Sequence, residues 1–263
     1  TAIPVVSRLT PIAYCVAPSM AFCITQGFRE WQDNLFVGAL KAQILVRLAF
    51  KDGQFKQKER LLRKTMSNLK EVATMYGKQL QVCRTTLKTR CRHGRGFQWG
   101  EYFCGPALFN VVYSIGGHSE LMIASTNKWE DDFIHGTDRR LDPHYSSSFL
   151  SISHNEGLDR ASKVKFILEH DPRCLDFLRV CWRNLDGKYN CTRCEKCLRT
   201  LYQIELFGYR DRAATFARGV VAGSKYWDFP PSSPLLAVKQ EELRALEDSL
   251  GVGRLQSLAD ILQ

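Results

Sequence analysis

Residues 180–208 read VCWRNLDGKYNCTRCEKCLRTLYQIELFG and hold four cysteines with the spacing of a metal site: Cys181, Cys191, Cys194 and Cys197. A C-x2-C turn folds two sulfurs inward, and four thiolates satisfy tetrahedral Zn²⁺ at about 2.3 Å each. Four thiolates leave no open position for water, so the pattern predicts a structural zinc ion rather than a catalytic one. An iron–sulfur cluster and a set of buried free thiols are the alternatives.

The residues between the cysteines predict how the chain folds around the ion. Asp186 and Gly187 are turn formers, placed to reverse the chain so that Cys181 meets the other three thiols. Thr192 and Glu195 have the spacing of a capping box, which predicts a helix that starts inside the cysteine cluster. Metal binding and helix formation are then coupled.

Apolar runs alternate with amphipathic segments over most of the chain. Strands are predicted at residues 11–16, 35–44, 80–85 and 121–125, and helices at residues 56–77, 100–115 and 237–250. Strands and helices in this order predict an α/β fold, a Rossmann-like parallel sheet with crossover helices, plus a small four-cysteine zinc module. Ligands of such sheets bind beyond the carboxyl ends of the strands.

The composition narrows the class of partner. The formal net charge of +10 favours polyanions such as nucleic acid or phosphorylated molecules, because they release counterions on binding. No run approaches the roughly 18–20 apolar residues of a membrane span, and residues 1–10 lack an export signal, so we expect a cytoplasmic protein with no membrane partner. No Ser-His-Asp, G-x-S-x-G or Walker signature occurs, which argues against a hydrolase or a P-loop NTPase.

Three motifs occur in the order found in one enzyme family: SKVKFILEH at residues 162–170, VCW at 180–182 and CTRCEKCLRT at 191–200. On these motifs the chain resembles 7-cyano-7-deazaguanine synthases of the PP-loop ATP pyrophosphatase superfamily. The polar stretch IASTNKWEDDFIHGTDRRLDP at 123–143 extends the resemblance. The resemblance implies a domain that binds ATP and Mg²⁺, adenylates a nucleobase-like carboxylate and lets a nitrogen or sulfur nucleophile displace AMP. An active chain would then be a ligase that forms C–N bonds.

The resemblance places ligand-binding positions in loops that follow predicted strands. The family's pyrophosphate loop reads Ser-Gly-Gly-x-Asp-Ser, whereas residues 15–20 read CVAPSM. The glycines that let backbone N–H groups approach phosphates are missing and Pro18 has no N–H, so either the ATP loop is degenerate or the functional loop precedes residue 1. Candidate residues are Ala17, Ser19, Ser125 and Asp132 for the nucleotide, and Asn127, Asp138 and Arg139 for the substrate.

These observations divide the chain into three parts and leave three functions open. Residues 1–170 form the Rossmann-like, PP-loop-type nucleotide-binding domain, residues 171–210 the zinc module, and residues 211–263 a C-terminal extension with a terminal helix. The first function is the ATP-dependent ligase, whose partner is a nucleotide or nucleobase-like small molecule. The others are a catalytically inactive binding or scaffold module and a zinc-stabilised nucleic-acid-binding protein. The sequence assigns no catalytic residue and no oligomeric state.

Overall fold

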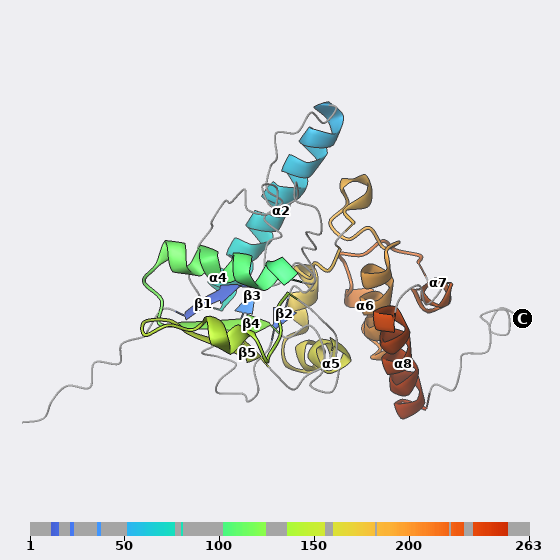
Figure 1. The fold of residues 1–263 in the computed structure, drawn as a ribbon. Helices are drawn as coiled ribbons and strands as arrows, with labels where there is room; N and C mark the ends of the chain where they lie inside the picture. The colour runs from blue at the N-terminus through green and yellow to red at the C-terminus, as the bar shows by residue number, and fades with distance from the viewer. Residues whose placement is uncertain are drawn as a thin grey trace, which may run out of the picture.

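The computed structural model describes the chain in eleven ranges (Figure 1). They are residues 12–15, 22–23, 36–37, 52–76, 80, 102–124, 136–155, 160–181, 183–220, 222–228 and 234–251. The strands and α-helices in chain order are β1 (Ile12–Cys15), β2 (Phe22–Cys23), β3 (Phe36–Val37), α2 (Asp52–Met75), α4 (Cys104–Ile115), β4 (Glu120–Ala124), β5 (Ser151–Asn155), α5 (Arg160–His170), α6 (Glu195–Leu206), α7 (Ala222–Trp227) and α8 (Pro234–Ser249). Short 3₁₀ turns are η3 (Asp142–Tyr145), η4 (Pro172–Asp176), η5 (Leu185–Gly187) and η6 (Arg210–Arg212).

Three of the strands form a parallel sheet in the order β1-β4-β5. Leu121 and Ile123 alternate along β4 and are fully buried, as expected of a strand with one face in a core. Phe109 and Val112 of α4 pack against them in one hydrophobic cluster, so α4 covers this face of the sheet (Figure 1). The strands β2 and β3 pair separately and antiparallel.

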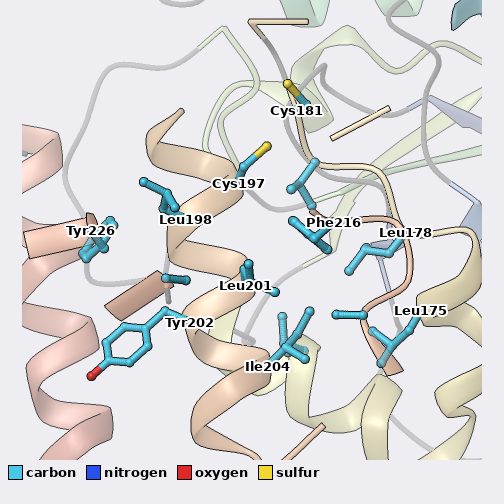
Figure 2. Packing of buried hydrophobic residues seen from close by; sticks show 14 of the residues in the cluster. Leu175, Leu178, Cys181, Cys197, Leu198, Leu201, Tyr202, Ile204, Phe216 and Tyr226 are labelled. Atoms are coloured by element: carbon cyan, nitrogen blue, oxygen red, sulfur yellow. The ribbon is translucent and has the colours of Figure 1, made fainter. Parts of the chain in front are cut away.

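A larger hydrophobic core surrounds α6, the helix that follows the cysteines (Figure 2). Leu198, Leu201 and Ile204 of α6 are buried, and the core draws on α5, the cysteine segment, α7 and α8 as well. Every residue from Cys197 to Ile204 is buried, polar ones included. The helix is therefore enclosed on all sides over these two turns, which is typical of a helix at the centre of a domain.

The helix α2 is amphipathic and lies against the cysteine segment. Leu69, Val72 and Ala73 are buried on one side, at helical spacing. The hydroxyl of Tyr76, just beyond the end of α2, donates a 2.6 Å hydrogen bond to Asp171 Oδ2. The side chain of Arg173 holds the same carboxylate with two hydrogen bonds of 2.7 Å. This cluster joins the end of α2 to the start of η4.

Several elements lie where the sequence predicts them. The strands predicted at residues 11–16 and 121–125 correspond to β1 and β4. The helices predicted at residues 56–77, 100–115 and 237–250 correspond to α2, α4 and α8, with boundaries that differ by a few residues. None of the helices in the described ranges has a stretch sufficiently long and apolar to pass through a bilayer.

Other predictions lie wholly or partly outside the described ranges. Residues 80–85 are described only at Leu80, and residues 35–44 only at β3, which pairs antiparallel with β2 rather than joining the parallel sheet. The Rossmann-like assignment of the whole chain stays a prediction. So do the three proposed parts, although the core around α6 contains residues from Val164 to Leu243 and thus spans both predicted boundaries.

Candidate metal centre

The four predicted ligands meet in one buried cluster. The Sγ atoms of Cys181, Cys191, Cys194 and Cys197 all lie within 4.8 Å of one another, and each residue is buried. The Sγ atoms of Cys191 and Cys197 are 3.9 Å apart. Four sulfurs arranged tetrahedrally at about 2.3 Å from a central ion are separated by about 3.8 Å. The cluster has the donor set and the dimensions to bind one metal ion.

The start of α6 positions two of the ligands. Cys194 is the N-cap residue of α6 and Cys197 lies in its first turn, so both sulfurs lie near the positive end of the helix. The backbone N–H of Cys194 donates to Cys191 Sγ at 3.3 Å, and that of Asn184 donates to Cys181 Sγ at 3.2 Å. Hydrogen bonds of this kind favour the thiolate form, which is the form that binds a metal.

Hydrogen bonds among the thiols also change their acidity. Hydrogen bonds from Cys194 and Cys197 hold the pKa of the Cys181 thiol well below its usual range. The hydrogen bond to Cys181 raises the pKa of Cys194 to about 11 and raises that of Cys197 as well. One thiolate is thus stabilised by two neighbouring thiols. A bound metal ion would displace the remaining protons, because metal binding requires deprotonated cysteines.

The chain between the ligands contains three non-glycine residues in the left-handed region. Asn184 and Asp186 have φ of 53° and 55°, a conformation that short polar side chains tolerate. Thr192 also has a φ of 53°, which is unusual for a β-branched residue and costs about 1–3 kcal/mol. Thr192 lies between the predicted ligands Cys191 and Cys194, where the turn must bring both sulfur atoms close together.

The capping box predicted at Thr192 and Glu195 is wrong. The helix starts at Glu195, with Cys194 as its N-cap, so Glu195 occupies the first helical position rather than the third. The hydroxyl of Thr192 instead accepts the backbone N–H of Ala217 at 2.9 Å, and the Glu195 carboxylate pairs with Arg199 at 3.1 Å. The spacing matched a capping box, but the metal-site cysteine takes the capping position.

The buried side chain of Asn190 connects the segments on either side of the cluster. Its Oδ1 accepts the backbone N–H groups of Val180 at 2.9 Å and Cys181 at 3.2 Å. Its Nδ2 donates to the backbone oxygen of Leu178 at 2.8 Å and to Thr215 Oγ1 at 3.1 Å. Sequence analysis missed this residue. Its position directly before Cys191 was the only signal that could have pointed to it.

Arg179 is a second residue that sequence analysis missed. Its guanidinium donates to the backbone oxygens of Cys181 and Tyr189, both at 3.3 Å, and to Asn184 Oδ1. Its Nε donates to Thr65 Oγ1 on α2 at 3.3 Å. Burial lowers the pKa of Arg179, while the neighbouring Tyr189, Cys181 and Cys197 act in the opposite direction. The positive charge of Arg179 thus lies beside the four thiols, where deprotonation would concentrate negative charge.

Five of the seven predicted nucleotide and substrate residues lie outside the described ranges: Ala17, Ser19, Ser125, Asn127 and Asp132. Asp138 and Arg139 lie in the turn before η3. The Asp138 carboxylate accepts three hydrogen bonds from Arg140, which hold the pKa of Asp138 below its usual range. Asp142 is buried and accepts the N–H of Asp138 at 3.0 Å. These contacts stabilise the turn locally, and a substrate-binding role for Asp138 and Arg139 stays a prediction.

Comparison with known families corrects the resemblance stated above. The model of a family described as Glucose / Sorbosone dehydrogenase matches residues 10–86. This finding overturns the resemblance to PP-loop ATP pyrophosphatases, and with it the deazaguanine synthase-like, ATP-dependent ligase function. The motifs that carried the resemblance centre on the cysteines, and C-x2-C spacing is set by the geometry of the ion, so it recurs among unrelated proteins.

The family match is confined to the N-terminal part of the chain. It covers less than a third of the residues and ends before the first cysteine of the cluster, so it does not assign the whole chain to that family. Its described part contains β1, β2, β3 and α2. Comparisons with curated proteins and with solved structures gave no significant match.

Proposed function

We propose that the four cysteines bind one structural zinc ion that organises the C-terminal half of the chain. The observation that supports this most strongly is the mutual approach of four buried thiols to within 4.8 Å. That span suits four ligands on a single ion. An iron–sulfur cluster would need additional room among the thiols for bridging sulfides and further iron atoms.

A structural role fits the ligand set better than a catalytic one. Catalytic zinc sites keep one position for water or substrate, whereas four cysteines fill the tetrahedral shell. All four residues are buried, and all four belong to the hydrophobic core around α6. Such a site excludes substrate and contributes to folding.

The ion would add a further link between the cysteine segment and α6, which already pack in one core. In the described residues between Cys181 and Cys191, 183–190, the helical element is the short η5 turn, and α6 begins directly after Cys194. Structural zinc binds such peptides with about 10–16 kcal/mol, which equals or exceeds the total stability of about 5–15 kcal/mol of a typical domain. Loss of the ion should therefore strongly destabilise this half of the protein.

The metal content of the purified full chain tests the proposal. We expect about one zinc per chain, because four thiolates make one site. Cys194→Ala should lose the zinc, whereas Cys104→Ala, which removes a buried thiol outside the cluster, should keep it. Full zinc content in Cys194→Ala, or a similar loss in both variants, would show that the cluster is not the site.

We also propose a polyanionic partner, supported by the net charge of +10 and by the exposed side of α2. Four exposed basic residues follow one another there at helical spacing: Arg60, Arg63, Lys64 and Lys70. In Figure 1 the first turns of α2 extend away from the rest of the described chain. A stripe of this kind would follow a row of phosphates, with an affinity that falls as salt rises.

Fluorescence anisotropy with a labelled single-stranded DNA at several salt concentrations tests this second proposal. Replacing all four basic residues of the α2 stripe by Gln should weaken binding and reduce the salt dependence. A matched control removes four exposed charges elsewhere: Lys165, Lys188, Arg218 and Lys225, all to Gln. Equal weakening by both variants would indicate a general effect of net charge and would reject the stripe as the site.

A further inference from the structure

The turn that separates the first two cysteines of the cluster lies against the basic helix α2. We define the zinc turn as residues 183–193, which contain η5 and the residues on either side of it. The η5 turn packs against α2. The guanidinium of Arg179 joins them, because it donates to Asn184 Oδ1 at the start of η5 and, at 3.3 Å, to Thr65 Oγ1 on α2. The zinc turn is therefore held beside the middle of α2.

The basic stripe of α2 passes next to this contact. Lys64 directly precedes Thr65, the residue that Arg179 contacts, and consecutive Cα atoms are about 3.8 Å apart. Arg60 lies one turn earlier on the same side as Lys64, because residues four apart are neighbours on a helix surface. The positive charge on α2 thus lies close to the zinc turn.

The zinc turn itself exposes further positive charge. Arg183, Lys188 and Arg193 are exposed, and the one carboxylate of the turn, Asp186, pairs with Arg193. Leu185 at the start of η5 is 37% exposed, so its apolar side chain is accessible from solvent. The zinc turn therefore presents three cations and one apolar side chain beside the α2 stripe.

The spacing of these charges indicates the class of ligand. Arg60 and Lys70 are ten residues apart, which corresponds to about 15 Å along the helix. One phosphate or carboxylate group cannot pair with both ends of such a stripe, whereas a chain of regularly spaced anions can follow it. A single-stranded nucleic acid also presents the faces of its bases, which suit the apolar side chain of Leu185. An acidic polypeptide has the charges and lacks the bases.

We propose that the zinc turn and the α2 stripe form one continuous surface for single-stranded nucleic acid. The cations of both elements pair with successive phosphates, and Leu185 contacts a base. This inference rests on the polyanionic partner proposed above, and it adds the zinc turn to the site and names the partner. The structural zinc ion would then serve binding indirectly, because its ligands flank the turn that carries Arg183 and Arg193.

Fluorescence anisotropy with a labelled oligothymidylate, measured on the zinc-loaded full chain at several salt concentrations, tests the proposal. The turn variant replaces Arg183, Lys188 and Arg193 by Gln. It should bind about tenfold more weakly at low salt, and the slope of log affinity against log salt should fall by about 2, because each phosphate contact on a single strand contributes about 0.7. Its zinc content should equal that of the wild type, since all four cysteines are kept.

A matched control removes three exposed charges from other elements: Lys165, Arg212 and Lys225, all to Gln. It should bind more tightly than the turn variant and keep the salt dependence of the wild type. Weakening equal to that of the turn variant would indicate a general effect of net charge and would overturn the proposal. Because the four-charge control for the α2 stripe includes Lys188, it should weaken binding slightly, and less than the α2 variant does.

Leu185→Ala tests the contact with a base. It should weaken binding of the oligothymidylate severalfold and leave the salt dependence unchanged, because it removes no charge. Polyglutamate at an equal concentration of charge should compete poorly with the oligothymidylate. Equal competition, or wild-type affinity in Leu185→Ala, would overturn the assignment to nucleic acid.

The outcomes separate this proposal from the one on which it rests. A wild-type protein that does not bind the oligothymidylate would refute the polyanionic partner and the composite surface together. A zinc-loaded turn variant that binds as tightly as the wild type, while the α2 variant binds weakly, would overturn only the role of the zinc turn.

Discussion

The side-chain oxygen of Asn190 accepts the backbone N–H of Cys181 at 3.2 Å. The two residues lie on opposite sides of the η5 turn, which reverses the chain. Asn190 directly precedes Cys191, so the side chain next to one metal ligand fixes the backbone of another. Its amide group also reaches Thr215, beyond the end of α6. The geometry of the cluster is therefore set by residues around the thiols as well as by the thiols themselves.

Replacing Asn190 by Ala should destabilise the protein by about 2–4 kcal/mol, because buried backbone N–H and C=O groups would lose their partners. Urea unfolding of the zinc-loaded protein measures this. Asn110→Ala, which changes an exposed asparagine on α4, should alter the free energy of unfolding by less than about 0.5 kcal/mol. A similar small effect for Asn190→Ala would show that the bridge does not hold the segments together.

Arg179→Gln should lower zinc affinity by about 10–100-fold, the range typical of residues that orient metal ligands. The guanidinium places a positive charge beside the thiolates and holds two backbone oxygens of the ligand loop. Competition with a chelator measures the affinity. Arg193→Gln breaks an exposed ion pair with Asp186 and should have little effect, since such pairs contribute little. Unchanged zinc affinity in Arg179→Gln would show that Arg179 does not support the metal site.

The carboxylate of Asp171 makes stability depend on pH in a specific direction. Hydrogen bonds from Arg173 and then Tyr76 hold the pKa of Asp171 below its usual range. A lowered pKa in the folded state stabilises the protein above the unfolded value, about 3.9, and this contribution is lost as the pH falls through the folded value. The wild type should therefore exceed Asp171→Asn in stability at pH 6, and the difference should shrink below about pH 4.

Chemical denaturation of both proteins at several pH values tests this expectation. Acid also releases the metal, so the zinc content is measured at each pH and the two proteins are compared at equal zinc content. A difference that stays constant from pH 6 to pH 3 would mean that the charge on Asp171 does not contribute.

Local patterns in the sequence identified the four thiols, because their spacing is dictated by the ion over a short stretch of chain. The roles of Asn190 and Arg179 could not be predicted, since their partners include backbone groups and Thr65 on a distant helix. The capping box failed because Cys194 occupies the capping position. Helix α2 was predictable from periodicity alone, because its apolar residues recur at helical spacing.

The family resemblance failed for a related reason. Its motifs were concentrated at the cysteines and the helices beside them, where the requirements of a metal site shape the sequence in many proteins. The family model that does match lies elsewhere, at residues 10–86. The short cysteine motifs therefore predicted that the four thiols meet better than they predicted ancestry or activity.

X-ray absorption at the zinc edge of the purified full chain tests the central claim most directly. The proposed site predicts four sulfur neighbours at about 2.3 Å and no nitrogen or oxygen ligand. A zinc ion with nitrogen or oxygen ligands in its first shell would contradict the four-cysteine structural site. So would a protein that contains iron with sulfide, or no metal at all.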